Sequence, residues 1–345
     1  MGGRSIAGGG VLALGAAIIF GASTPLVQHF GRGVGPFTTA ALLYFGSALF
    51  AAVPSGTRGD PVRGSDAPRL LTVTLLGAVV APIALAWGLQ RTSGVVASLL
   101  LNLDVLFTVL LARLIWRERI GARVAAAMVA TLLGGGLLVF DGRSMSIEAG
   151  WGAFAIVVAT LAWAGDSVIG RPLAERDTSQ VIIAKGTVGA ALSLALSRGM
   201  GEPWPARWAA LALLVCGVVG YGASLRLYLR AQRAVGAART GTVFAAAPFI
   251  GASMAWAMGE RAGGAATVAA AGLCALGVAL QLTEQHAHGH THDAVEHAHP
   301  HRHDDGHHDH VHGGAVPQEH SHAHRHERVT HEHPHAEDAH HRHEH

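Results

Sequence analysis

The chain has 345 residues, of which 50% are apolar and only 14% carry a charge. A soluble protein carries about 25% charged residues, so this composition argues against two or three soluble domains and against an ordinary soluble enzyme. The charge is also divided unevenly, because residues 1–285 have 21 Lys and Arg against 12 Asp and Glu, whereas residues 286–345 have 4 against 11. A basic body is therefore joined to an acidic tail.

Apolar segments of about 20 residues, the length that spans a bilayer as a helix, follow one another from the first to the last part of the body. The first segment follows Arg4 and ends in small residues, as a secretory signal does, but we expect it to be retained. The sequence thus predicts an all-α integral membrane protein with ten transmembrane helices. They are expected at residues 9–29, 37–54, 69–90, 93–113, 120–140, 150–171, 179–198, 206–229, 235–258 and 264–283.

The basic residues of the body stand in short clusters between these segments and not on one polar face. With ten helices and the N-terminus inside, 15 Lys and Arg fall on the inner side and 6 on the outer side. Short loops rich in Lys and Arg stay in the cytoplasm. We therefore predict a multi-pass protein of the cytoplasmic (inner) membrane with both termini in the cytoplasm, and no nucleic-acid partner.

An internal repeat links residues 94–138 to residues 236–280, which align without gaps at an offset of 142. The sequence Glu-Arg-x-Gly begins at Glu118 in the first copy and at Glu260 in the second. Five helices are an odd number, so the second unit is expected upside down in the membrane, an arrangement typical of secondary transporters. The predicted domains are two five-helix repeats at 1–145 and 146–285, followed by a tail at 286–345.

A family resemblance lies in the two segments that carry this repeat, "LLLNLDVLFTVLLARLIWRERIGA" (99–122) and "GAARTGTVFAAAPFIGASMAWAMGER" (236–261). They resemble the fourth and ninth helices of the EamA family in the drug/metabolite transporter superfamily. The resemblance implies a carrier with a central cavity that often exports metabolites. The family often has a proline after the acidic residue of the fourth helix, where this chain has Val105, whereas Pro248 is kept in the second half.

Ionisable groups at membrane depth are costly, which makes Asp104 and Asp166 candidates for proton coupling or for pairing with a cationic solute. The alternative is a carboxylate hydrogen-bonded to a neighbouring helix as a structural feature. Asn102 stands two residues before Asp104. The aromatic candidates to line the cavity are Trp163, Tyr221, Tyr44, Trp87 and Trp256, although aromatic residues near helix ends are more often interface anchors.

Charged residues near the predicted helix ends have a simpler expected role. Glu118 and Glu260 are expected to form boundary ion pairs or caps. Lys185 and Arg226 are expected to extend towards the cytoplasmic surface. The Thr24-Pro25 and Ala81-Pro82 pairs are candidates to break the first and third helices.

The tail holds 23 of the 24 histidines, largely as His-x-His alternation. A segment this polar is predicted to be disordered. Imidazoles two residues apart can turn onto one ion, so the tail is expected to bind zinc, nickel, cobalt or copper(II). The alternative is a solvated tail without a role in transport. The candidate ligands are His286, His288, His290, His292, His297, His299, His301, His303, His320, His322, His324, His326, His331, His333 and His335.

The sequence as a whole favours a gradient-driven transporter of a small metabolite, an exporter that needs no cofactor and works within the lipid bilayer. A second hypothesis is a carrier of divalent nickel, cobalt or zinc ions that uses the tail to collect or sense metal. A third, from another class, is a membrane-anchored metal buffer or sensor without transport. An enzyme is not expected, and a homodimer is left open. The motif His-Glu-x-x-His at 331–335 contains Pro334 and does not predict a metalloprotease.

Overall fold

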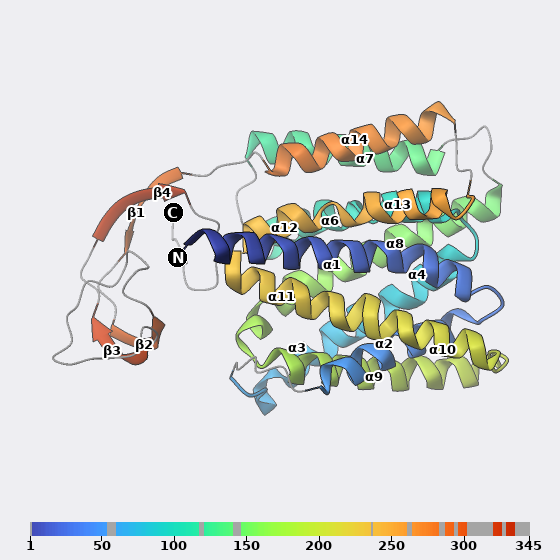
Figure 1. Cartoon of the computed structure of the whole chain (residues 1–345), viewed down its shortest axis with the longest axis horizontal. Helices are drawn as coiled ribbons and strands as arrows, with labels where there is room; N and C mark the ends of the chain where they lie inside the picture. The colour runs from blue at the N-terminus through green and yellow to red at the C-terminus, as the bar shows by residue number, and fades with distance from the viewer. Residues whose placement is uncertain are drawn as a thin grey trace. The chain divides into compact units, whose positions relative to one another are not determined.

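The computed structural model divides the chain into two compact units, Met1–Glu284 and Gln285–His345, which we describe separately. The structure describes residues 2–53, 60–116, 121–140, 146–235, 237–260, 264–282, 287–292, 296–301, 320–325 and 329–334. The regular structure described in the first unit is helical, apart from one isolated β-bridge between Asp60 and Arg176, and the helices lie side by side as a bundle (Figure 1).

The helices of the bundle alternate in direction and are joined by short connections (Figure 1). In the first half they are α1 (Gly2–Phe30), α2 (Pro36–Ala51), η1 (Gly64–Asp66), α3 (Ala67–Thr74), η2 (Leu75–Val80), α4 (Ala81–Leu89), α5 (Gly94–Leu100), α6 (Leu103–Trp116) and α7 (Ala122–Phe140). In the second half they are α8 (Ile147–Gly170), η3 (Arg171–Glu175), α9 (Thr178–Gly199), α10 (Arg207–Cys216), η4 (Gly217–Ala223), α11 (Ser224–Val235), α12 (Ala237–Phe244), α13 (Ala247–Ala257) and α14 (Ala265–Leu282).

Each of the ten apolar segments predicted from the sequence falls on one of these helices or on a consecutive set of them. Six helical stretches among the described residues are long and apolar enough to cross a bilayer, and α2, α7 and α14 are shorter apolar helices. Many large apolar side chains on the outside of the bundle are exposed, Leu114 and Val268 among them. Such an outer surface suits lipid, because a bilayer solvates apolar side chains.

The backbone reproduces the internal repeat beyond the region where the sequence shows it. The third segment contains the π-helix η2 at residues 75–80, and the eighth contains the π-helix η4 at 217–223, again 142 residues further on. The fourth and ninth segments are both interrupted, at residues 101–102 and 245–246. The interruption thus occurs in both halves, although only the second keeps a proline there. The expected break of α1 at Pro25 is wrong, since α1 continues through it.

Close packing within the bundle depends on small residues, as is usual between helices in membranes. The antiparallel helices α2 and α9, the second of each repeat, cross at Gly186, where a Cβ would overlap Ala48 and the Tyr44 carbonyl. The last helices of the two repeats, α7 and α14, meet at Gly134 and Gly277. Equivalent helices of the two repeats therefore pack against one another.

The second unit contains four short strands in the described parts of the tail, β1 (Ala287–His292), β2 (Glu296–His301), β3 (His320–Arg325) and β4 (Val329–Pro334). β1 pairs antiparallel with β4, and β2 pairs antiparallel with β3. The prediction that the tail is disordered is therefore wrong for these residues, and the all-α class holds only for the first unit. The reason is the His-x-His alternation, whose period of two is that of a strand.

Candidate functional site

An ion pair between α8 and α9 forms the centre of the candidate site. Lys185 Nζ lies 2.6 Å from Oδ1 and 2.6 Å from Oδ2 of Asp166. The two side chains keep only 19% and 17% of their surface exposed. The prediction that Lys185 extends to the surface is wrong, because it instead neutralises a carboxylate within the bundle. Its position within the apolar run 181–197, four residues after the run begins, was the signal for this role.

The π-helix η2 shapes the surroundings of Asp166. A Cβ at Gly77 would overlap the Asp166 carboxyl group, so only glycine allows this approach. The Gly77 carbonyl also accepts hydrogen bonds from the hydroxyl of Tyr44 and, at 3.1 Å, from Nε1 of Trp163. A π-turn disrupts the regular helical ladder and is frequent at functional sites. Here it offers a carbonyl to two aromatic side chains from α2 and α8.

Aromatic rings from both repeats extend this site towards α1. The ring of Tyr221, which belongs to the second π-helix η4, lies 5.8 Å from the ring of Tyr44 and 6.0 Å from the ring of Phe20. Phe20 in turn lies 5.5 Å from Phe244 on α12. The structure therefore brings together four of the candidates predicted from the sequence, Asp166, Trp163, Tyr44 and Tyr221, and adds Lys185 to them.

Asp104 lies in the first turn of α6, directly after the interruption between α5 and α6. Its Oδ1 atom is buried without a hydrogen-bond partner. Helix α6, which carries Asp104, packs against α8, which carries Asp166. Asn102 has a different role, since its Nδ2 donates a 2.9 Å hydrogen bond to the Leu99 carbonyl and so caps α5.

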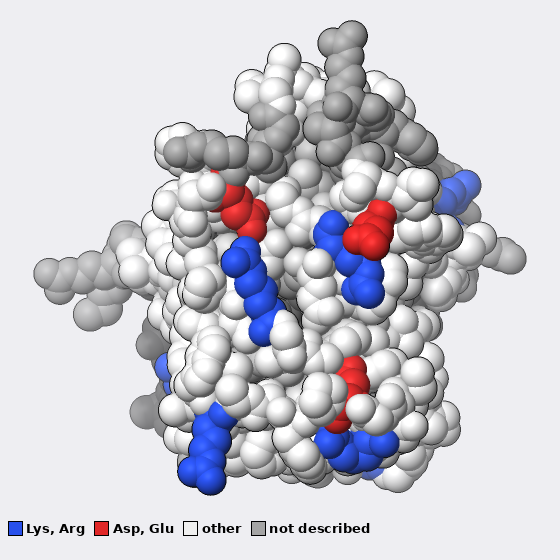
Figure 2. All heavy atoms as spheres, turned by 90° about the vertical axis from the view of Figure 1, so that its right-hand side faces the viewer, with Lys and Arg blue, Asp and Glu red and all other residues white. Residues whose placement is uncertain are grey.

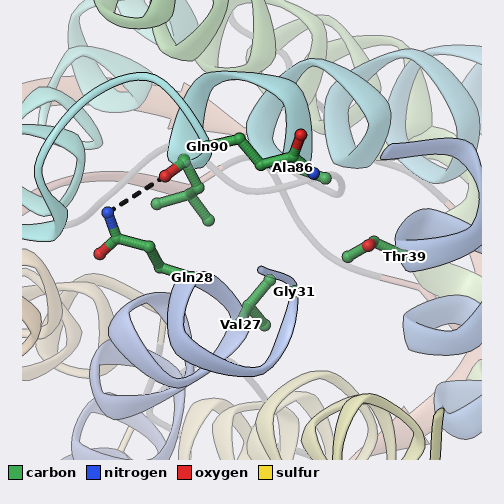
Figure 3. Close-up of a pocket in the computed structure, with 7 residues that line it drawn as sticks. Val27, Gln28, Gly31, Thr39, Ala86 and Gln90 are labelled. Atoms are coloured by element: carbon green, nitrogen blue, oxygen red, sulfur yellow. Dashed lines mark hydrogen bonds between the residues drawn. The ribbon is translucent and has the colours of Figure 1, made fainter. Parts of the chain in front are cut away.

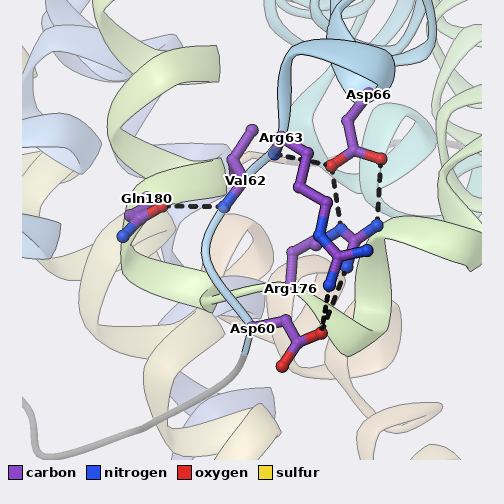
Figure 4. Close-up of polar contacts among 6 residues, drawn as sticks. All are labelled: Asp60, Val62, Arg63, Asp66, Arg176 and Gln180. Carbon is purple, nitrogen blue, oxygen red and sulfur yellow. Dashed lines mark hydrogen bonds and ion pairs between the residues drawn. The ribbon is translucent and has the colours of Figure 1, made fainter.

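Outside this site, ion pairs at one face of the bundle connect the two repeats (Figure 4). We call it the N-terminal face, because α1 begins there. Arg176 Nε lies 2.8 Å from Asp66 Oδ2, and Arg176 Nη1 lies 3.4 Å from Asp60 Oδ2. The Asp177 amide donates to the Asp60 carbonyl at 2.6 Å. Together they hold the segment before α3 against the start of α9.

At the opposite face two glutamates from the second repeat cap helices of the first. Glu202 accepts hydrogen bonds from the amides of Phe37 (3.1 Å) and Thr38 (2.8 Å) at the start of α2. Glu260 accepts a 2.6 Å hydrogen bond from the Gly94 amide at the start of α5, which confirms its expected role as a cap. Glu118 lies outside the described residues. Charged side chains on this face are scattered over a largely uncharged surface (Figure 2).

A narrow pocket lies between α1, α2 and α4 (Figure 3). It is lined by Val27, Gln28, Gly31, Thr39, Ala86, Leu89 and Gln90. Gln28 Nε2 donates to the carbonyls of Leu89 and Thr92, and the buried Thr39 hydroxyl has no partner. The pocket leaves no room for even a water-sized molecule, so it cannot take a metabolite without widening.

The tail strands place histidines opposite one another. His288 pairs with His333 and His290 with His331 in one sheet, and three further His–His pairs, 297 with 324, 299 with 322 and 301 with 320, occur in the other. His292 of the first sheet is opposite Val329. His286, His303, His326 and His335 lie outside the described residues. Across the residues that the structure describes, no group of three or more His, Cys, Asp or Glu is arranged to hold a metal ion.

Comparisons with known proteins identify a transporter family, a related transporter and a solved structure of similar fold. The model of the EamA-like transporter family matches residues 7–140 and 150–283. A protein of Methanothermobacter thermautotrophicus described as "Uncharacterized transporter" is 30% identical over 262 residues, which cover 70% of this chain and 76% of that protein. A solved crystal structure, 21% identical, has a TM-score of 0.57 and covers 79% of this chain and 96% of its own. This last likeness concerns the fold alone.

Proposed function

Because the chain belongs to the EamA-like transporter family and is a membrane transporter, we propose that it is a gradient-driven exporter of a small solute. The observation that carries this proposal is the Lys185–Asp166 pair beneath the π-helix η2, among aromatic rings from both repeats. Inverted repeats move against one another around a site near the middle of the bilayer. The sequence contains no G-x-x-x-x-G-K-[ST] phosphate-binding loop, which agrees with transport that is driven by a gradient.

Ten membrane crossings, with both termini in the cytoplasm of a cell with an inner membrane, are part of this proposal. The N-terminal face would then face the cytoplasm, which agrees with the excess of Lys and Arg on that side. Export would begin from this face, where Arg176 and its partners join the two repeats. Solute would leave at the face where Glu202 and Glu260 cap α2 and α5.

The experiment uses the full chain in proteoliposomes loaded with a defined mixture of amino acids, amines, sugars, organic acids and the ions of zinc, nickel and cobalt. A pH gradient is applied, and mass spectrometry identifies what leaves. We expect at least one organic solute to leave only from vesicles that contain the protein. The matched control is Glu148→Gln, an exposed acid in the first turn of α8, which should transport normally. Release of no solute at all by the folded protein would contradict the proposal.

The same solute mixture also tests the alternative hypothesis, in which the protein carries divalent metal ions. Its support is the histidine-rich tail, because imidazole binds zinc, nickel, cobalt and copper(II). The bundle gives it little support, since its described residues offer no metal-ligand group. Efflux of a metal ion without any organic solute would favour this alternative.

We further propose that the tail binds divalent metal ions on the cytosolic side. Antiparallel pairing places His288 and His290 beside His333 and His331, so one face of that sheet gathers four imidazole-bearing positions. Deletion of residues 286–345 is expected to abolish tight zinc and nickel binding, measured by calorimetry on the purified full chain. If the truncated protein binds as many ions with the same affinity, the tail is not the metal-binding part. Transport by the truncated protein without metal should be unchanged, and a metal effect seen only in the full chain would assign the tail a regulatory role.

A further inference from the structure

The backbone of the two repeats is related by an offset of 142, but the charged residues of the candidate site are not. Asp104 of the first repeat corresponds to Ala246. Asp166 and Lys185 of the second correspond to Thr24 and Leu43. The symmetry that duplicates the π-helices and the helix interruptions therefore supplies no second ammonium group to the site.

The charges within the bundle do not balance. Lys185 donates to both oxygens of Asp166, so this pair is neutral as a unit. Asp104 remains, with a buried oxygen that has no hydrogen-bond partner, on a helix that packs against the helix of Asp166. A site with two carboxylates and one ammonium carries one excess negative charge when all three are ionised.

The other charged groups on helices that pack against α6 lie near helix ends. Arg113 lies nine residues after Asp104 on α6, about 13 Å away by helical rise. Arg123 begins α7, and Glu148 lies in the first turn of α8, eighteen residues before Asp166. The hydroxyls of Tyr44 and Tyr221 are the remaining titratable groups near the pair. None of them donates a hydrogen bond to the buried Oδ1 of Asp104.

An uncompensated charge is expensive in an environment of low dielectric constant, so Asp104 requires a positive partner in every state that is closed to water. A proton on the carboxylate meets this requirement, and so does the positive group of a bound solute, but the two exclude each other. Rings such as those of Tyr44, Trp163 and Tyr221 attract a cation as well as an apolar body.

We propose that Asp104 holds alternately a proton and the positively charged group of the solute, and that the solute is a monovalent organic cation with an apolar body. The proton leaves the carboxyl group for water when the cation binds, so one proton enters for each cation that leaves and no net charge crosses the membrane. The Lys185–Asp166 pair stays closed throughout the exchange. This inference rests on the proposed function and specifies its substrate class and coupling ion.

The test uses the full chain in proteoliposomes that contain a mixture of three classes of aromatic probe: aryl trimethylammonium ions, phenyl glucosides and aryl sulfonates. The outside is made acidic, efflux is measured by mass spectrometry, and a trapped pH dye records proton entry. We expect only ammonium ions to leave, with about one proton entering per ion and with a rate that does not depend on an imposed membrane potential.

Two variants connect this exchange to Asp104. Asp104→Asn keeps the size of the side chain but cannot release a proton, and we expect it to slow the exchange at least about tenfold, equivalent to about 1.4 kcal/mol, and to remove its dependence on external pH. Asp104→Glu retains the carboxyl group and should keep that pH dependence. Glu148→Gln is the control and should resemble the wild type. A purely structural role of Asp104 would change the amount of folded protein and not the pH profile.

The remaining outcomes would overturn either the inference about Asp104 alone or the proposed transport function as well. Efflux of glucosides or sulfonates without ammonium ions would overturn the inference and leave the proposed transport function standing. Proton entry that persists in Asp104→Asn would also overturn it. If no probe and no metabolite moves, the proposed function fails together with the inference.

Discussion

The fourth segment of the first repeat carries Asp104, whereas the matching position of the second repeat is Ala246, although both segments are interrupted at the same place. Likewise, the π-helices η2 and η4 match in position, but only η2 has a carboxylate against its glycine. The two repeats thus share their backbone irregularities and differ in their charges. Duplication explains the scaffold, whereas each charge of the site is present in only one of the two equivalent positions.

The two ends of the α2–α9 pair also combine equivalent positions in the repeats with different charged groups. Glu202 and Asp60 are separated by 142 residues, and both connect one repeat to the start of the second helix of the other. Glu202 does so by capping backbone amides, whereas Asp60 and Asp66 do so through Arg176. The two contacts occupy equivalent positions in the two repeats but differ in chemistry, since one is a carboxylate that caps backbone amides and the other is a set of ion pairs. The stability of the two faces should therefore respond differently when a charged group is removed or protonated.

The largest predicted effect comes from removing one member of the buried pair. Lys185→Met leaves Asp166 without its counter-ion and should lower the free energy of unfolding by about 3 kcal/mol, at the lower end of the range for a buried pair because both side chains keep some exposure. The double variant Asp166→Asn/Lys185→Met removes both charges and should recover most of this loss. Thermal unfolding in detergent measures this loss of stability. Equal losses of stability in the single and double variants would show that the two charges are not coupled.

The next effect concerns the two π-helices. Gly77→Ala places a Cβ into the Asp166 carboxyl group and should destabilise the protein by about 2 kcal/mol, as overpacking of a close contact does. The matched control is Val219→Ala at the corresponding position of η4, where the side chain is 43% exposed. Its effect should stay within about 0.5 kcal/mol. Similar unfolding temperatures for the two variants would contradict the assignment of a special role to η2.

A smaller effect is expected at the N-terminal face. Arg176→Ala removes contacts to Asp66 and Asp60, and it should cost about 1–2 kcal/mol because the Asp66 carboxylate is buried and loses charged hydrogen bonds. Arg63, 61% exposed in its pair with Asp60, provides the control. Arg63→Ala should cost less than about 0.5 kcal/mol, the usual value of an exposed pair. Limited proteolysis near residue 60 would report whether the segment before α3 is released.

The smallest effect is a pH dependence at the opposite face. Partial burial opposes ionisation of Glu202, but hydrogen bonds from the side chain and amide of Thr38 and the amide of Phe37 outweigh it and hold its pKa below the ordinary value of 4.5. A lowered pKa contributes stability that is present above pH 4.5 and is lost as the pH falls through the folded value. Glu202→Gln should therefore flatten the unfolding temperature between pH 5 and about pH 3. An unchanged pH profile would show that the cap is not ionised.

The sequence predicted the helices well, because runs of about 20 apolar residues have few alternatives to a membrane helix. It also located Asp104, Asp166, Trp163 and Tyr221, since polar and aromatic residues stand out in such runs. It did not predict the Lys185–Asp166 pair, the π-helices or the role of Gly77. These depend on which faces of separate helices meet, and no periodicity within one helix contains that information. The histidine alternation was assigned to disorder from its polarity, although its period also fits a strand.

Transport by the charge-neutral double variant tests whether the Lys185–Asp166 pair belongs to the transport site. Asp166→Asn/Lys185→Met should fold with nearly the stability of the wild type, because it buries no unpaired charge. In proteoliposomes under an inward proton gradient, however, we expect it to release the solute that the wild type exports at less than about a tenth of the wild-type rate. Export at the wild-type rate by this folded variant would show that the solute passes elsewhere, and would contradict the assignment of this pair to the transport site.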